Sequence, residues 1–143
     1  MNRIAQTLFQ AALVAALPVT APAEPAQAGR LSLELNAIAP AEGGCLLSFV
    51  AGNGHAGDIA AAVFETVLMD GAGRVARLTL FDFGALPAGR PRVRQFLVPD
   101  LACGDLGAVL INGAQSCEAG ALGPSACAEG LQLTTRTEVE VIG

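Results

Sequence analysis

Short segments in which apolar and polar residues alternate recur along this chain, and turns rich in glycine and proline separate them. In the clearest segment, Leu31, Leu33 and Leu35 alternate with polar residues. A period of two is typical of a strand with one buried face. The predicted strands cover residues 31–36, 45–51, 59–69, 74–83, 92–98, 106–112 and 131–142. Because no segment is a well-marked helix, they predict an all-β fold, an antiparallel β-sandwich of about seven strands.

The segment 59–69 fits two patterns. Ile59, Val63 and Val67 are also spaced as on one face of a helix. The second half of the segment, however, is rich in β-branched and aromatic residues, and the following Asp-Gly-Ala-Gly at 70–73 is typical of a hairpin turn. We therefore predict a strand, joined through this turn to the next strand.

The first 28 residues have the order of a signal peptide. Arg3 supplies a positive start, residues 4–17 contain an apolar stretch too short to span a bilayer, and Ala and Pro follow. Two small-x-small cleavage sites come next, at 21–23 and 26–28, and we favour the second. The alternative, an uncleaved membrane anchor, requires a longer apolar run. The sequence therefore predicts a periplasmic or secreted protein without membrane insertion after cleavage.

The predicted mature domain, residues 29–143, is small and acidic. The chain carries 8 basic and 13 acidic residues, a formal net charge of −5. An acidic surface repels phosphate backbones, so we expect no nucleic-acid partner. The length fits one domain with a modest two-layer core.

Part of the chain resembles bacterial extracytoplasmic immunoglobulin-like domains of the FxLYD and fibronectin-III-like kind. The resemblance rests on Asn53 after the second strand, the hairpin LMDGAGRV at 68–75, the turn LPAG at 86–89, and Phe96. It implies an immunoglobulin-like β-sandwich. The whole chain is also similar to secreted proteins of alphaproteobacteria, which implies a compartment but no activity.

Four cysteines in an exported chain are expected to form two disulfides. The sequence alone leaves three pairings open. In an immunoglobulin-like strand order, the second and sixth strands start at the same end of the sandwich, which places Cys45 beside Cys103. Cys117 and Cys127 then close a local ring before the last strand. There is no Cys-x-x-Cys and only one histidine, so we expect neither a metal nor a redox cofactor.

Few residues suit catalysis. His55 and Asp58 share a flexible loop, where a lone histidine is usually solvated, and no Gly-x-Ser-x-Gly elbow is present. Glu65, Asp70 and Asp82 could gather near one hairpin, although strand surface and turn positions explain them as well. We predict that the protein is not an enzyme.

Arg90, Arg92 and Arg94 form the one local concentration of charge. Spacing of two along a strand projects their side chains from one face, as an anion-binding or partner-binding stripe. The alternative is cross-strand pairing with acidic neighbours such as Glu34.

These observations favour a non-catalytic interaction or structural module of the cell envelope, with another envelope protein as its partner. Its working surfaces would be the arginine strand and the loop at 113–130. A small-ligand or polysaccharide-binding domain is the alternative, weakened by the absence of Trp and Tyr. A small hydrolase, using His55 and Asp58, is less favoured. The oligomeric state stays open.

Overall fold

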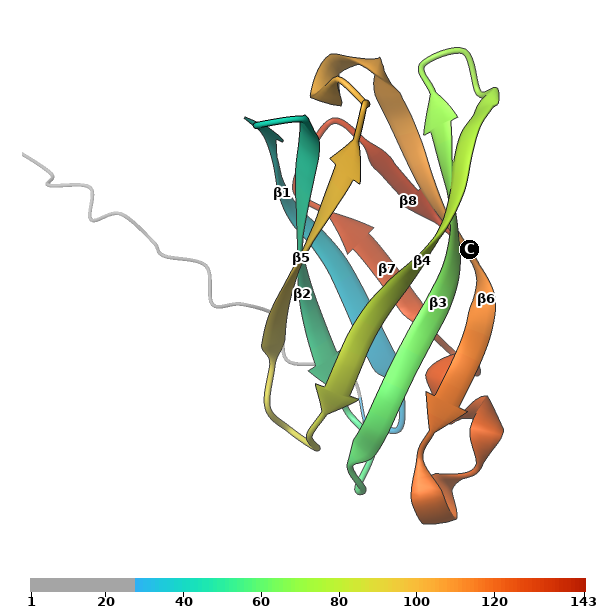
Figure 1. The fold of residues 1–143 in the computed structure, drawn as a ribbon. Helices are drawn as coiled ribbons and strands as arrows, with labels where there is room; N and C mark the ends of the chain where they lie inside the picture. The colour runs from blue at the N-terminus through green and yellow to red at the C-terminus, as the bar shows by residue number, and fades with distance from the viewer. Residues whose placement is uncertain (1–27) are drawn as a thin grey trace, which may run out of the picture.

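The structure, a computed structural model, describes residues 28–143; the predicted signal peptide, apart from its last residue, lies outside the described residues. Two four-stranded sheets pack as a β-sandwich (Figure 1). Sheet A has the strand order β5-β2-β1-β7, and sheet B has the order β4-β3-β6-β8. The strands are β1 (Leu31–Ala41), β2 (Gly44–Asn53), β3 (Ile59–Asp70), β4 (Val75–Leu86), β5 (Arg92–Pro99), β6 (Leu106–Glu118), β7 (Gln132–Thr135) and β8 (Glu140–Ile142). Three short 3-10 helices are η1 (Cys103–Asp105), η2 (Gly120–Leu122) and η3 (Pro124–Cys127).

Both predicted hairpins are present. β1 and β2 pair antiparallel, and Leu31, Leu33 and Leu35 are fully buried, as their alternation predicts. The segment 59–69 is a strand, and it pairs antiparallel with β4. Asp70 stabilises the turn between them, because its Oδ1 accepts the backbone N–H groups of Ala72 and Arg74, each at 2.9 Å.

The core is a cluster of phenylalanine rings between the sheets. Phe49 of sheet A lies edge-on to Phe81 and Phe83 of sheet B, with ring centroids 6.0 and 5.6 Å apart. Phe96 of β5 stacks on Phe81 at 4.2 Å, and Phe64 of β3 packs edge-on against Phe83 at 5.6 Å. Edge-to-face and stacked arrangements are those that aromatic rings prefer. The cluster joins four strands from both sheets.

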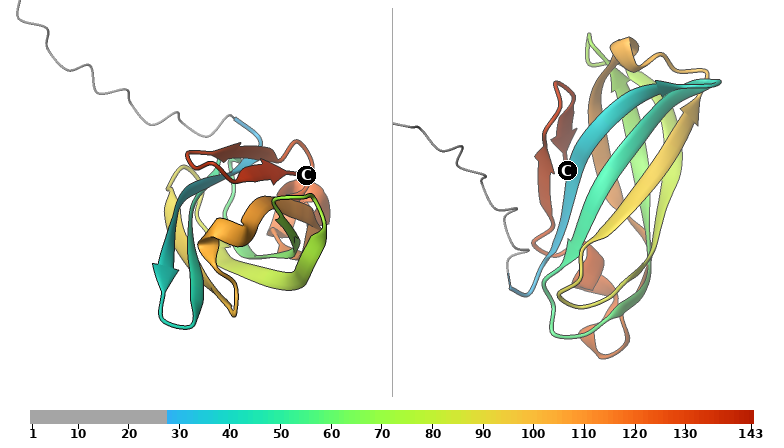
Figure 2. Two further views of the ribbon diagram at one scale, coloured as in Figure 1. Left: turned by 90° about the horizontal axis from the view of Figure 1, so that it is seen from above. Right: turned by 90° about the vertical axis from the view of Figure 1, so that its left-hand side faces the viewer.

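The prediction of wholly antiparallel sheets is wrong. β7 pairs parallel with β1, and β8 pairs parallel with β6, so both sheets are mixed. β6 ends at the end of the sandwich where β1 begins, and the chain therefore re-enters beside β1 in the same direction (Figure 2).

The predicted last strand, 131–142, forms two strands instead of one, so the described residues form eight strands. Its alternation is interrupted because threonine hydroxyls bond the backbone: Thr137 N–H donates to Thr135 Oγ1 at 3.0 Å, and Val139 N–H donates to Thr137 Oγ1 at 3.1 Å. The chain passes from sheet A to sheet B here, and the side chain of Val139 is buried. β7 thus joins sheet A and β8 joins sheet B.

β6 is longer than predicted. It continues through residues 113–118, which pair with the first half of β3. These residues are small or polar and lack the alternation of a strand. Their strand conformation depends on pairing with β3, which the sequence does not show. The predicted loop is correspondingly shorter and contains η2 and η3.

Both disulfides have the predicted pairing. Cys45–Cys103 joins β2 of sheet A to η1, directly before β6 of sheet B, and spans 58 positions of the sequence. Cys117–Cys127 spans 10 positions and holds η3 against the end of β6. The first links the two sheets at one end of the sandwich, and the second closes the loop at the other.

The two disulfides are expected to differ in their contribution to stability. Replacing Cys45 and Cys103 together by alanine should lower the free energy of unfolding by about 4 kcal/mol, and replacing Cys117 and Cys127 by about 3 kcal/mol, because the longer ring removes more chain entropy from the unfolded state. Equilibrium urea unfolding of the oxidised proteins measures both losses. A larger loss from the short ring would contradict this account.

Candidate functional site

The outer face of sheet B carries apolar side chains across all four strands. Cross-strand pairing aligns Leu78 of β4, Val67 of β3, Leu110 of β6 and Ile142 of β8, which we call the apolar row. Leu78 is 59% exposed and Ile142 is 41% exposed, whereas Val67, between its neighbours, is only 6% exposed. The row is therefore continuous from one edge of the sheet to the other.

Further apolar side chains widen this face. Leu80 follows Leu78 on the same side of β4 and is 52% exposed. A register shift in β4 pairs Val75 with Met69, which places Val75 on the outer face as well. Among the described residues, six large hydrophobic side chains are exposed, and four of them lie here; the other two are Val93 and Leu97 on β5. Large contiguous apolar patches on a protein surface are typical of interaction sites.

The sequence carried a signal for this face that the strand prediction did not use. Leu78 and Leu80 have the opposite parity to Phe81 and Phe83 along β4. Successive side chains of a strand point to opposite faces, so both pairs cannot be buried on one side. The larger phenylalanines occupy the core, and the leucines are left outside.

Most charged side chains beside the apolar row are acidic, and the basic Arg74, next to Val75, is paired with Asp70. Glu65 pairs across the strands with Leu80, Asp82 follows Leu80 on the same side of β4, and Glu140 pairs with Ala108. The face is thus apolar in the middle and negatively charged at its border.

The three carboxylates that the sequence placed near one hairpin have separate partners. Glu65 accepts a hydrogen bond from the side chain of Asn112. Asp70 forms an ion pair with Arg74 at 2.8 Å, and Asp82 accepts a backbone N–H two residues along its own strand. The N–H of Arg74, with its guanidinium, sets the pKa of Asp70 below its ordinary value. Each carboxylate therefore supports local structure.

The predicted arginine stripe is only partly free. Arg92 and Arg94 lie on the same side of β5, and Arg90 precedes the strand. Arg94 donates from Nε to the carbonyl of Phe83 at 2.6 Å and from Nη2 to the carbonyl of Ala85 at 3.1 Å. Its guanidinium therefore bridges β5 of sheet A and β4 of sheet B, where no strand pairing joins them.

Glu34 pairs with a different arginine from those of the stripe. Its Oε1 accepts hydrogen bonds from Arg136 Nε and Asn36 Nδ2, each at 2.9 Å. Partial burial raises the pKa of Glu34, but these hydrogen bonds and the charge of Arg136 outweigh it, so the pKa lies below its ordinary value. Arg136 follows β7, so this pair fastens the end of β7 to β1.

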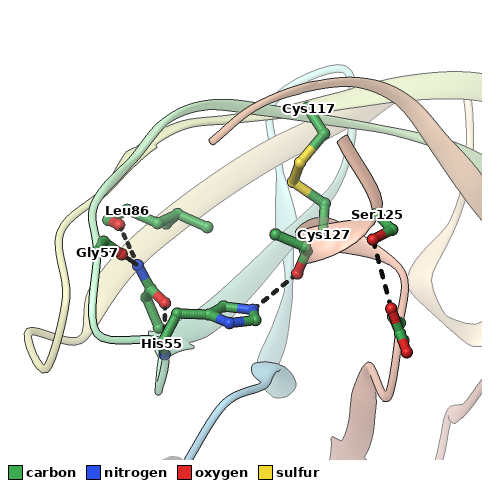
Figure 3. Close-up of a disulfide and its surroundings, with 9 residues drawn as sticks. His55, Gly57, Leu86, Cys117, Ser125 and Cys127 are labelled. Carbon is green, nitrogen blue, oxygen red and sulfur yellow. Dashed lines mark hydrogen bonds between the residues drawn. A yellow bond between two sulfur atoms is a disulfide. The ribbon is translucent and has the colours of Figure 1, made fainter. Parts of the chain in front are cut away.

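Asn53 is a buried structural residue at the end of β2. Its Nδ2 donates to the carbonyls of Gly57 at 3.0 Å and Leu86 at 2.8 Å, and its Oδ1 accepts the N–H of His55 at 2.9 Å (Figure 3). One side chain thus joins the β2–β3 loop to the end of β4. The sequence marked this asparagine only through the resemblance.

His55 and Asp58 hold loops together. His55 Nε2 donates to the carbonyl of Ala126 in η3 at 2.8 Å (Figure 3), which ties the β2–β3 loop to the segment closed by Cys117–Cys127. Asp58 Oδ1 accepts the N–H of Ala88 at 2.8 Å. No hydrogen bond joins the two side chains in the described part of the chain. The histidine expected to be solvated is instead tethered.

The described residues offer few features for ligand chemistry. Within residues 28–143, no three His, Cys, Asp or Glu side chains gather as metal ligands, and no helix is long and apolar enough to cross a membrane. The phenylalanines between residues 28 and 143 lie in the core cluster, where they do not form the exposed stacking face that sugars usually require.

Comparison with known proteins identifies no relative. No protein-family model, curated protein or solved structure matches this chain. The function is therefore inferred from the chain's own geometry.

Asn53→Ala is expected to destabilise the fold by about 3 kcal/mol, because it leaves buried carbonyl groups without donors. Asn36→Ala is the matched control: the same atoms are removed from an exposed side chain, and the loss should be about 0.5 kcal/mol or less. Urea unfolding compares the two. Equal losses would show that the buried hydrogen bonds of Asn53 contribute no more to the free energy of unfolding than the exposed one of Asn36.

The Glu34–Arg136 pair predicts a pH dependence. Because the folded protein lowers the pKa of Glu34, the stabilisation is present above the unfolded pKa, about 4.3, and is lost as the pH falls through the folded pKa. The pair is partly exposed, so we expect less than about 1 kcal/mol. Glu34→Gln should therefore be less stable than wild type at pH 7 and equal to it near pH 2. Glu42→Gln, without an ion pair in the described residues, is the control; a difference for Glu34→Gln that is independent of pH would contradict the prediction.

Proposed function

We propose that this protein is a non-catalytic interaction module of the cell envelope, periplasmic or secreted, that docks another protein on the outer face of sheet B. The observation that carries the proposal is the apolar row, which crosses all four strands of the sheet. In a sandwich whose inner faces already form the core, an apolar outer face has no role in folding. Burial against a partner is what it favours.

The fold that presents this face is proposed to be immunoglobulin-like. In support, β1, β2 and β5 share one sheet, while β3, β4 and β6 share the other. This matches strands A, B and E against C, C′ and F of immunoglobulin-like sandwiches. The division of the final segment into β7 and β8 departs from the single last strand of that pattern.

The proposed compartment rests on two kinds of observation. The chain begins with the order of a signal peptide, and all four cysteines of the described domain are paired. Disulfides persist in oxidising compartments such as the periplasm. They also stabilise a small domain whose exposed surface is partly apolar.

The charges at the border indicate the chemistry of the partner. Glu65, Asp82 and Glu140 surround the row, so an apolar patch bordered by Arg or Lys would complement it. A second copy of this chain would bring acidic borders together. The partner is therefore proposed to be a different protein.

The test is crosslinking of the tagged protein in cells, followed by identification of what co-purifies. Leu78→Glu with Leu80→Glu should abolish capture of a specific envelope protein. Val93→Glu with Leu97→Glu is the matched control, since it places the same charges at exposed apolar positions on β5, and it should leave capture intact.

A third variant, Arg90→Glu with Arg92→Glu, tests the arginine strand separately. Loss of the partner only in this variant would move the site to β5. Equal loss of capture in the Leu78/Leu80 variant and in the Val93/Leu97 variant would contradict the proposed face. Capture of a second copy of this chain alone would contradict the proposed partner.

A further inference from the structure

One edge of β6 is left open inside the sandwich. β3 pairs with the first edge of β6 along its whole length, but β8 pairs with the second edge only at residues 108–110. In the described part of the chain, no strand pairs with this second edge from Ile111 onward. The backbone groups that point away from β3 there are free to bond another strand.

A second open edge belongs to β7. It pairs with β1 on one side, and no strand of the described domain pairs with its other side. On one side of the sandwich, which we call the seam between β6 and β7, sheet A ends at β7 and sheet B ends at the short β8 (Figures 1 and 2). Two strand edges that run in opposite directions thus border the same seam.

A groove of about 490 Å³ lies at this seam. Leu131, Leu133 and Val141 supply apolar wall, whereas Gly113 and Ala114 of β6 contribute almost no side chain. At this point the groove is also lined by Phe64 of β3, which is fully buried. It combines an apolar floor with strand edges, which are the two elements that recognise an extended peptide.

The segments around the groove are acidic. Glu129 lies between two lining residues, and Glu138 lies in the turn before β8, whereas Glu140 faces the outer side of sheet B. The side chain of Arg30 lies beside the lining residue Gly130, and the nearby Arg136 is bonded to Glu34. Neither Glu129 nor Glu138 forms an ion pair within residues 28–143. Positive charge on a ligand would therefore be attracted here.

We propose that this groove is an acceptor site for one extended peptide strand, with apolar side chains at alternate positions and basic residues at its ends. Inserted between β6 and β7, the strand would bond both open edges and extend the pairing that β8 begins. Alternate apolar side chains would enter the space over Gly113 and Ala114. The groove shares Ile142 with the apolar row, but its other lining residues lie between the sheets, and the proposal does not rest on the proposed function.

The test uses two synthetic octapeptides, Arg-Thr-Val-Thr-Val-Thr-Val-Arg and the same sequence with Glu at both ends. Titration of the ¹⁵N-labelled protein should shift the backbone amide signals of residues 111–115 and 132–135. The Arg-ended peptide should bind several-fold more tightly than the Glu-ended one. No shift at millimolar peptide, or shifts confined to the free edges of β4 and β5, would overturn the proposal.

Two variants keep the test specific. Ala114→Leu fills the groove with an apolar side chain and should abolish the shifts while the remaining spectrum stays folded. Glu129→Gln with Glu138→Gln changes only exposed carboxylates and should weaken the Arg-ended peptide alone. Equal binding of both peptides to the wild-type groove would contradict the proposed preference for basic residues at the ends of the ligand. Amide shifts on the outer face of sheet B would place the binding on that surface instead of in the groove.

Discussion

The packing of phenylalanine rings between the two sheets is the interaction on which the rest of the structure depends. The chain has neither Trp nor Tyr, so the large aromatic core residues within residues 28–143 are Phe49, Phe64, Phe81, Phe83 and Phe96. Once these rings face inward, the parity of every strand that carries them is determined. The exposure of Leu78 and Leu80 follows from the burial of their neighbours on β4.

The two seams of the sandwich are closed in different ways. At the seam between β4 and β5, Phe81 stacks on Phe96 and the Arg94 guanidinium bonds the carbonyls of β4. At the seam between β6 and β7, the short β8 covers only part of the strand edge. The first seam is filled by the chain's own side chains, whereas the groove lies at the second.

Four polar residues named in the sequence analysis stabilise the fold. Asn53, His55 and Asp58 connect loops at one end of the sandwich, and Arg94 closes a seam. Buried or half-buried polar groups require such partners, and these loops supply backbone groups as partners. Function is thus proposed for the surfaces that folding leaves unused: an apolar sheet face and an open groove.

The sequence by itself determined the local structure. Alternation and turn residues located the strands up to residue 112 and the hairpin at 70–73, because these features depend on neighbours along the chain. Four cysteines in an exported chain indicated two disulfides, and their pairing followed from the immunoglobulin-like strand order. Tertiary structure alone decided the extension of β6, the division of 131–142 between two sheets, and the partners of Glu34 and Arg94. Each of these depends on atoms supplied by a distant segment, and no local pattern encodes which distant backbone or charge will be within hydrogen-bonding distance.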